Sequence, residues 1–428
     1  MSLDVLVVVL AGGEGTRLWP LTAERNKPAV PFGGKYRLVD IPLSNAVNSG
    51  LNRILMVTQG KDDSFTRHIN HAWHLDPKHG VIRGISPQEQ GGEYLGDADS
   101  VRQILDKVKR ERPEIVLVVP GDNVVKMDYL RFARFLDGYK GASAAISMVE
   151  KPIARAGDLG SMVVNFESRI TYFREKDPNT PLRASDEDHF YASMGTYAFR
   201  TGVLLRVLKE NPGSLFGKDI FPPLIKEAIV LGYNFSKENE IRGYRFDPAT
   251  FSYAPVRRTR DSDYWEDAGR ISEYHAVHMD LVGVEPKFDI HSPNEPGSMD
   301  SRWYWPLRTF VEGGLGPGKI LRGGEVRDVV LSDGVILSSV GAYRCVFSPM
   351  VHVENSSLEN AIVFEGAVIR NCRIKNAIID KNVRLEGVEI GYGKSPDEAI
   401  FLSSLGISVV PKNFGRDDFK RDLYTRAR

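Results

Sequence analysis

The pattern of hydrophobic and polar positions divides the chain into two regions of different texture. In the first region, short apolar runs rich in β-branched residues alternate with stretches of helical periodicity. The apolar runs are residues 5–10, 53–58, 115–119, 143–148 and 194–199, and the helix-like stretches include 98–112 and 202–210. A run that is apolar throughout suits a strand covered on both faces, as in a parallel sheet. The alternation predicts an α/β layered domain over roughly the first 280 residues.

In the second region, hydrophobic residues return at a constant interval of 16 positions. Three such columns are Val330, Val346, Ile362 and Ile378; Val335, Val351, Ala367 and Val383; and Leu358, Ile374 and Ile390. Because this stretch is poor in helix formers, the repeat predicts a stacked β-coil with one inward residue per side. An antiparallel β-sandwich is the alternative, but its turns do not enforce equal spacing over several rungs.

Between the two regions, residues 284–318 are rich in Pro, Gly, Ser and Asn and contain Trp303 and Trp305. This composition predicts a connection between the two domains that packs against another part of the protein. The expected domains are therefore 1–283, a linker at 284–318, and 319–428.

Composition limits the classes of function. The chain has 428 residues, of which 42% are hydrophobic, enough for about two or three domains of roughly 150 residues. Lys plus Arg and Asp plus Glu both number 56, so no overall field recruits nucleic acid or an anionic membrane. No membrane span or signal peptide is evident, so we expect a cytoplasmic protein. Cys345 and Cys372 lack metal-ligand spacing and are expected to be buried small hydrophobes.

A glycine-rich turn, residues 11–18, directly follows the first apolar run. Its three glycines let backbone N–H groups approach an anion, and a helix starting after it would add its positive end. A tight structural turn explains the glycines equally well, and the spacing fits neither a dinucleotide fingerprint nor a P-loop. Arg17, Arg25 and Lys27 follow closely, and such cations favour the charge that develops on a departing pyrophosphate.

Two carboxylates complete the candidate chemistry. Asp122 lies just beyond the apolar run 115–119, where ligands bind in open α/β sheets. Asp267 lies far away in sequence, beside Gly269. Two such groups could hold Mg²⁺ against phosphate oxygens. The alternative is that Asp122 starts a turn and Asp267 caps a helix.

The motifs resemble those of the sugar-phosphate nucleotidylyltransferases, at residues 11–17, 25–34, 121–128, 192–197 and 264–269. Further segments are typical of the glucose-1-phosphate adenylyltransferases, also called ADP-glucose pyrophosphorylases: 27–40, 43–45, 48–50, 192–195, 216–219 and 305–309. The resemblance spans essentially the whole chain. It implies an α/β, Rossmann-like nucleotidyltransferase domain followed by a left-handed parallel β-helix. It also implies transfer of the adenylyl group of ATP to α-glucose 1-phosphate for glycogen synthesis, with Mg²⁺, a homotetramer and a small-molecule allosteric effector.

The resemblance also assigns roles to residues. Arg17 would stabilise pyrophosphate, Lys27 would contact the nucleotide phosphates, and Asp122 with Asp267 would bind Mg²⁺. The implied nucleotide-binding residues are Leu10, Ala11, Gly12, Gly13, Gly15, Thr16, Gln88, Gln90 and Gly96, with either glutamine reading adenine. The implied sugar-phosphate-binding residues are Tyr94, Gly160, Glu175, Lys176, Ser193 and Gly195.

Four positions depart from the family's pattern. They are Asp97 for a threonine, Asp177 for a proline, Asn123 for a histidine, and Glu24 for a lysine that contributes to activator binding in some members. A charge at Asp97 could alter the nucleotide preference, so a different nucleotide or sugar remains an alternative. A non-catalytic regulatory subunit is another. A third is a bifunctional enzyme whose repeat region transfers acyl groups, for which His352 is the sole histidine there.

Overall fold

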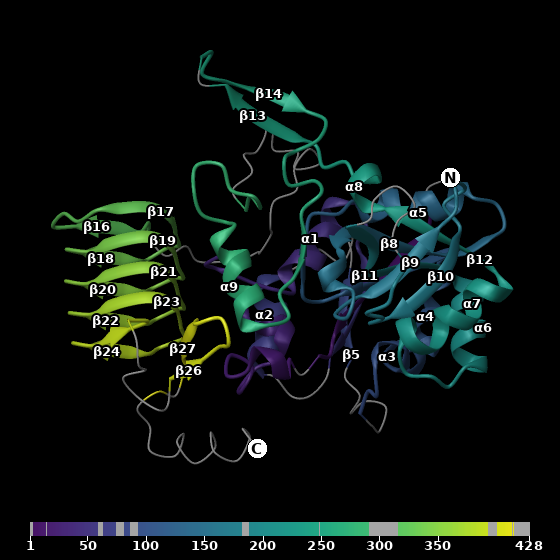
Figure 1. Cartoon of the computed structure of the whole chain (residues 1–428), viewed down its shortest axis with the longest axis horizontal. Helices are drawn as coiled ribbons and strands as arrows, with labels where there is room; N and C mark the ends of the chain where they lie inside the picture. The colour runs from purple at the N-terminus through teal and green to yellow at the C-terminus, as the bar shows by residue number, and fades with distance from the viewer. Residues whose placement is uncertain are drawn as a thin grey trace.

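A computed structural model describes residues 3–13, 15–58, 63–73, 81–85, 93–181, 188–247, 249–290, 316–392, 400–412 and 414. Figure 1 shows a layered α/β body beside a stack of short strands. Within these ranges, no helix is long and apolar enough to cross a membrane.

The described part of the first domain is built on a nine-stranded sheet. Its path is β10-β9-β11-β6-β1-β4-β5, and β8 pairs with β11 and β12. The strands are β1 (Val5–Ala11), β4 (Arg53–Thr58), β5 (Val81–Ile85), β6 (Ile115–Pro120), β8 (Ala142–Pro152), β9 (Gly160–Val164), β10 (Ile170–Glu175), β11 (His189–Arg200) and β12 (Ile229–Asn234). Strands β5, β4, β1 and β6 run parallel, and β11 is antiparallel to β6. All five predicted apolar runs are strands of this sheet.

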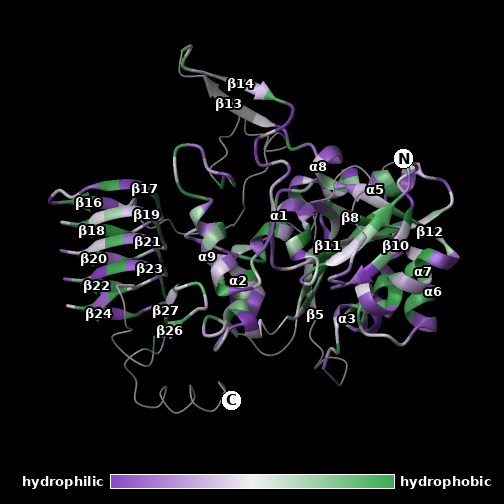
Figure 2. Ribbon diagram, in the orientation of Figure 1, coloured by the Kyte–Doolittle hydropathy of each residue, from purple (hydrophilic) through white to green (hydrophobic). Residues whose placement is uncertain are grey.

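Both faces of the sheet are covered by helices, which explains the uninterrupted apolar run of β1. Val5, Val7 and Val9 join one core cluster, whereas Leu6 and Val8 join the other. The first cluster involves α1 (Asp40–Asn48), α2 (Asp63–Ala72) and α5 (Tyr129–Gly138), and the second α3 (Asp97–Gln103), α4 (Leu105–Glu111), α6 (Thr201–Glu210) and α7 (Phe221–Glu227). Figure 2 shows hydrophobic stretches along the sheet and hydrophilic outer faces on helices such as α6. The alternation confirms the predicted α/β class.

Short elements complete this domain. They are η1 (Thr16–Leu18), η2 (Lys27–Ala29), β2 (Pro31–Phe32), β3 (Tyr36–Arg37), β7 (Asn123–Val125), η4 (Ile153–Arg155), the π-helix η5 (Phe216–Ile220), α8 (Phe235–Glu238), β13 (Gly243–Asp247), β14 (Ser252–Val256), β15 (Trp265–Asp267) and α9 (Ile271–Met279). The β13–β14 hairpin projects from the body, and α9 lies on the side of the strand stack (Figure 1).

The second domain is a parallel β-helix. One sheet contains β16 (Lys319–Leu321), β18 (Ile336–Ser338), β20 (His352–Glu354), β22 (Val368–Arg370) and β24 (Arg384–Glu386). The other contains β17 (Val326–Leu331), β19 (Gly341–Phe347), β21 (Ser357–Val363), β23 (Arg373–Ile379), β25 (Glu389–Ile390), β26 (Phe401–Leu402) and β27 (Ser408–Val410). Successive strands pair in parallel at the predicted interval, as in Val346 with Ile362 and Ile362 with Ile378. Parallel pairing excludes the antiparallel sandwich.

The corners of the coil are also periodic. Backbone φ is positive at Asp328, Arg344, Asn360 and Asn376; at Gly334, Met350, Gly366 and Asn382; and at Gly323, Ser339, Asn355, Asn371 and Gly387. Asn and Gly tolerate this left-handed conformation better than other residues. The middle residues of β19, β21 and β23 are among them, so each of these strands bends between two sides of the coil.

One of the three predicted columns faces outward, which corrects the prediction of an inward residue on every side. Val330, Val346, Ile362 and Ile378 cluster with Phe32, Tyr274 and Leu281 of the first domain. The other two columns lie in the core of the coil. Because side chains alternate along a strand, the neighbours of the outward column, such as Cys345 and Phe347, point inward instead. The outward column therefore joins the two domains.

A buried ion pair reinforces this junction. Arg25 donates two hydrogen bonds of 2.9 Å to Asp380, and the two side chains are 8% and 2% exposed. His275 of α9 lies 2.8 Å from the carbonyl oxygen of Asn360. The start of the predicted linker also packs in this junction. Phe288 and Ile290 are buried in the junction cluster, which is the cluster that contains the outward column. Trp303 and Trp305 lie outside the described residues.

Candidate active site

Strand pairing brings the two candidate carboxylates together. Asp122 follows β6, and the next residues form β7, which pairs antiparallel with β15. In that register Asp267 is opposite Asn123. The two acids therefore lie side by side although 145 positions separate them in the sequence. Asp267 ends a strand and does not cap α9, whose N-cap is Arg270.

Lys27 and Arg17 approach these carboxylates. The Lys27 ammonium lies 2.5 Å from Asp122 Oδ2 and 3.2 Å from Asp267 Oδ1, and an Arg17 nitrogen lies 4.0 Å from Asp267 Oδ2. Burial lowers the pKa of Lys27, but the charges of Asp122 and Asp267 outweigh it, so the net shift of this pKa is upward. Lys27 is therefore a fixed cation. Arg17 is about half exposed and is accessible to a ligand.

The glycine-rich turn packs against Lys27. A Cβ at Gly15 would lie 2.7 Å from the Lys27 Cβ, and the Gly15 φ is positive, so only glycine fits here. The carbonyl of Gly13 accepts a hydrogen bond from the Lys27 N–H, and that of Leu10 accepts one from the Gly121 N–H. These bonds place the turn beside Asp122. Ala11, Gly12 and Thr16 belong to the same turn.

Two expectations about this turn are wrong. Only the single 3-10 turn η1 follows the glycines, because the chain passes through η2 and β2 before α1 begins at Asp40, so no long helix aims its dipole here. Arg25 does not reach the site, since its guanidinium is held by Asp380 of the β-helix.

Four of the residues implied for sugar binding come together where β10 ends and β9 begins, beside the middle of β11. Glu175 pairs with Gly160, where an added Cβ would lie 2.7 Å from a Glu175 carboxylate oxygen and 3.4 Å from the Ser193 Cβ. The Gly195 N–H donates to the Ser193 hydroxyl at 3.2 Å. Burial raises the pKa of Glu175, Lys176 lowers it and Asp97 raises it further. Lys176 is exposed and has a positive φ, a strained conformation for lysine.

The departures from the family's pattern have local structural roles. Asp97 accepts hydrogen bonds from the backbone N–H groups of Ala98 and Phe216 at 2.7 and 2.8 Å, and so joins α3 to η5. Asp177 accepts hydrogen bonds from Tyr172 and from the Asn179 N–H in the turn after Lys176.

The other two departures also have partners. The Asn123 side chain donates to the Met194 carbonyl at 2.7 Å, which joins β7 to β11. Glu24 pairs with Lys412 at 2.6 Å on the surface of the domain junction.

The remaining predicted residues are placed as follows. Tyr94 is 8% exposed and lies within a core cluster. Gly96 precedes α3, and a side chain there would collide with the Ser214 carbonyl. Gln88 and Gln90 lie outside the described residues. His352, on β20, is partly exposed.

Three features of the site were missed in the sequence. A Cβ at Gly269 would lie 2.9 Å from Asp267 Oδ2 and 3.1 Å from the Arg17 guanidinium, so glycine lets both groups pack against the backbone here. Gly217 packs in the same way on the Glu175 carboxylate. Lys151 pairs with Glu266 at 2.8 Å, next to Asp267. The two glycines lie in recognised motifs, but no sequence signal identifies Lys151.

Comparison with known proteins agrees with this geometry. A family described as nucleotidyl transferase matches residues 6–283, and a GlmU-like C-terminal hexapeptide family matches residues 317–410. The class of protein is therefore a nucleotidyl transferase with a C-terminal hexapeptide-repeat domain.

Several curated relatives match nearly the whole chain. A glucose-1-phosphate adenylyltransferase of Corynebacterium diphtheriae is 35% identical over 423 residues, covering 96% of this chain and 93% of the relative. Glucose-1-phosphate adenylyltransferase 2 of Alkalilimnicola ehrlichii is 36% identical over 438 residues, covering 97% and 96%. A glucose-1-phosphate adenylyltransferase of Bifidobacterium longum is 34% identical over 434 residues, covering 97% and 99%. The chain belongs to the glucose-1-phosphate adenylyltransferase family.

Proposed function

We propose that the protein transfers the adenylyl group of ATP to α-glucose 1-phosphate, giving ADP-glucose and pyrophosphate. The observation that carries the proposal is the meeting of Arg17, Lys27, Asp122 and Asp267, which come from three distant segments of the chain. Such a cluster of fixed charges suits a reaction between two phosphorylated substrates. Membership of the glucose-1-phosphate adenylyltransferase family supports the same substrates.

The chemistry requires little beyond position and charge. A phosphate oxygen of glucose 1-phosphate attacks the α-phosphorus of ATP in line, and pyrophosphate leaves, so no protein nucleophile is needed. In our proposal Lys27, held by two carboxylates, contacts the nucleotide phosphates. Arg17 is exposed beside them and neutralises the charge that develops on pyrophosphate. The turn from Leu10 to Thr16 would cover the nucleotide.

The donor set fits Mg²⁺. Asp122 and Asp267 offer two neighbouring carboxylates about one-quarter exposed, and Mg²⁺ commonly takes one or two carboxylates plus water and phosphate oxygens. The described residues contain no group of three or more His, Cys, Asp and Glu side chains that could hold a metal by themselves. Substrate oxygens would therefore complete the shell. When bound, the ion would withdraw charge from the phosphates.

The sugar phosphate would occupy the pocket of Glu175. Its carboxylate can accept hydroxyl hydrogens, and the neighbouring glycines, Gly160 and Gly217, let it pack directly against their backbone, which fixes its position. Lys176 would hold the phosphate. We also propose that the enzyme works in the cytoplasm as a homotetramer in glycogen synthesis, under the control of a small effector.

A substrate matrix tests the proposal. The full-length protein is incubated with Mg²⁺, each of four nucleoside triphosphates and several hexose 1-phosphates, and pyrophosphate release is measured. We expect ATP with glucose 1-phosphate to give the highest kcat/KM. Faster release with another nucleotide or sugar would overturn the substrate assignment. Absence of turnover alone, with stimulation of an active homologue, would instead identify a regulatory subunit.

A further inference from the structure

Four charged side chains form a closed ring at the edge of the candidate active site. Two arginines and two carboxylates alternate around it, so each side chain has two partners of opposite charge. The nitrogen-to-oxygen distances are 2.7 Å for Asp158–Arg270, 3.8 Å for Arg270–Glu273, 3.0 Å for Glu273–Arg155 and 3.5 Å for Arg155–Asp158. An isolated surface ion pair contributes little to stability, but a network of this kind can hold its members in one geometry. We refer to these four residues as the charge ring.

The charge ring joins two segments that are far apart in the sequence. Arg155 ends η4 and Asp158 follows it, whereas Arg270 is the N-cap of α9 and Glu273 lies in its first turn. The Arg270 N–H also donates a hydrogen bond of 3.1 Å to the Glu273 carboxylate, which fixes the beginning of this helix. Asp158 and Arg270 are 112 positions apart and share two hydrogen bonds, of 2.7 and 3.2 Å. The ring therefore ties α9 to the segment that leads into β9.

One side of the charge ring leads to the proposed sugar-phosphate residues. Asp158 lies two positions before Gly160, which packs on the Glu175 carboxylate. The Leu159 carbonyl, next to Asp158, accepts a hydrogen bond of 3.1 Å from the Lys176 N–H. A shift of Asp158 would therefore move the backbone that lies beside both Glu175 and Lys176.

The other side of the charge ring leads to the proposed Mg²⁺ and pyrophosphate residues. Arg270 lies three positions after Asp267, and the intervening Gly269 packs against both the Asp267 carboxylate and the Arg17 guanidinium. The hydrogen bond from Arg270 lowers the pKa of Asp158, and the charge of Arg17 lowers this pKa further. The ring is therefore ionised at neutral pH and lies within electrostatic range of Arg17.

We propose that the charge ring fixes the distance between the sugar-phosphate residues and the metal-binding carboxylates, with Asp158 and Arg270 as positioning residues. In-line attack requires the sugar phosphate oxygen and the α-phosphorus to be aligned about 3 Å apart, and a misplacement of about 1 Å can lower the rate about a hundredfold. A bond network that joins the two halves of the site therefore acts on the chemical step. The inference rests on the proposed adenylyl transfer for the identity of the ligands.

Neutral variants of the closest pair test the kinetic consequence. Asp158→Asn and Arg270→Gln should each lower kcat for pyrophosphate release about tenfold and leave both KM values within about twofold, because the binding groups remain and only their relative position changes. The double variant should be no slower than the slower single variant, because the same interaction is lost in all three. Additive losses would show that the two residues act separately. A much larger loss in Arg270→Gln than in Asp158→Asn would show that Arg270 contacts a phosphate itself, and either result would overturn the proposal.

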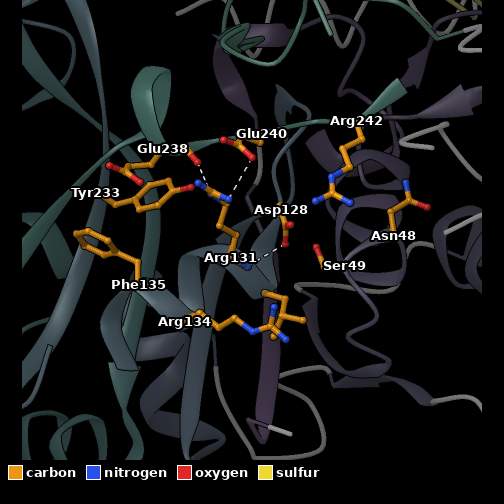
Figure 3. A pocket seen from close by; sticks show the side chains of 11 residues that line it. Asn48, Ser49, Asp128, Arg131, Arg134, Phe135, Tyr233, Glu238, Glu240 and Arg242 are labelled. Atoms are coloured by element: carbon orange, nitrogen blue, oxygen red, sulfur yellow. Dashed lines mark hydrogen bonds and ion pairs between the residues drawn. The ribbon is translucent and has the colours of Figure 1, made fainter. Parts of the chain in front are cut away.

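Glu240→Gln is the matched control. Glu240 also pairs with two arginines, Arg131 at 3.4 Å and Arg257 at 2.9 Å, and its side chain is partly exposed like that of Asp158. It lines a cavity of about 500 Å³ between α1, α5 and β12, where Figure 3 shows its contact with Arg131. The control should keep the kcat of the wild type, and its urea midpoint should change as little as that of Asp158→Asn. An equal loss of kcat in the control would assign the effect to the loss of any ion pair and overturn the proposal.

ADP-glucose gives a readout that does not depend on turnover, because this ligand spans both halves of the proposed site. In isothermal titration calorimetry of the full chain, Asp158→Asn should weaken ADP-glucose binding about fivefold and leave the binding of ATP alone and of glucose 1-phosphate alone within about twofold. Equal effects on all three ligands would overturn the proposal. Failure of the wild type to release pyrophosphate would refute the proposed function, while the titrations would still decide the role of the charge ring.

Discussion

Asp122 lies between β6 and β7, and its carboxylate shares the buried Lys27 ammonium group with the Asp267 carboxylate. Replacing it with asparagine keeps the volume and removes the charge. We expect Asp122→Asn to lower kcat by about two to three orders of magnitude, because a metal ligand would be lost. Lys27 keeps Asp267 as a partner, so the urea midpoint should change little. Asp106→Asn, at an exposed carboxylate of α4, is the control, and equal kcat values for the two variants would contradict the assignment.

Substitution of Lys176 should affect the KM values for the two substrates differently. The Lys176→Ala variant should raise the KM for glucose 1-phosphate about tenfold and leave the KM for ATP within about twofold, since a phosphate contact is lost on one substrate only. Steady-state kinetics with each substrate varied in turn measures both constants. Lys209→Ala, at the end of α6, provides the comparison. A similar rise in both KM values would remove Lys176 from the sugar pocket.

Protonation of Glu175 should make the activity fall on the acidic side of the pH profile, which is called the acid limb here. Burial raises the pKa of this carboxyl, so it gains its proton at a higher pH than an ordinary glutamate and then accepts fewer hydroxyl hydrogens. The kcat/KM for glucose 1-phosphate should therefore fall as the pH drops through the raised pKa. Glu175→Gln should be less active at neutral pH but lack this limb. A limb that persists in the variant would assign it to another group.

At the scale of elements, the ion pair between the η2 region and the β-helix offers a test of the junction. Arg25→Ala leaves Asp380 as a buried, unpaired carboxylate, which should reduce the free energy of unfolding by about 3 kcal/mol. The exposed pair of Glu24 and Lys412 is the matched control, and Glu24→Ala should cost less than about 1 kcal/mol. Urea unfolding measures both values. Equal losses would show that Arg25 contributes no more than a surface charge.

How far the sequence predicts the molecule depends on the range of the interaction. The β-branched run of β1 and the 16-residue interval are local signals, and both predicted their strands. The sequence predicts Asp122 from its place after an apolar run and Asp267 from its place beside a glycine turn. Their proximity depends on the pairing of β7 with β15, which no local pattern encodes. The prediction that Arg25 lies at the site is wrong for the same reason, because its partner, Asp380, lies 355 positions away.

At the scale of the whole molecule, a buried histidine links the junction to pH. His278 of α9 accepts a hydrogen bond from the Gly33 N–H and donates one to the Tyr274 carbonyl, at 3.2 and 2.9 Å. Burial lowers its pKa from 6.5 to about 3. Between these values the unfolded chain is protonated and the folded chain is not. Stability should therefore fall with pH below 6.5, by about 1.4 kcal/mol per unit from this residue.

Urea unfolding between pH 7 and pH 5 measures this slope. His278→Gln should reduce this slope by up to about 1.4 kcal/mol per pH unit, the contribution of one proton. An unaltered slope in the His278 variant would assign the loss of stability to other buried groups.

The outward column of Val330, Val346, Ile362 and Ile378 sets a rule for how this molecule can change length. Each member comes from a successive coil, one strand spacing of about 4.8 Å from the next. Inserting or deleting 16 residues would add or remove one rung and keep the docking stripe aligned with the first domain. Val409 continues the same stripe, since it pairs with Ile378 and lies in the junction cluster, although 31 positions separate the two residues. The 16-residue rule therefore holds for the coils from Val330 to Ile378, where the domain can be lengthened or shortened in whole turns.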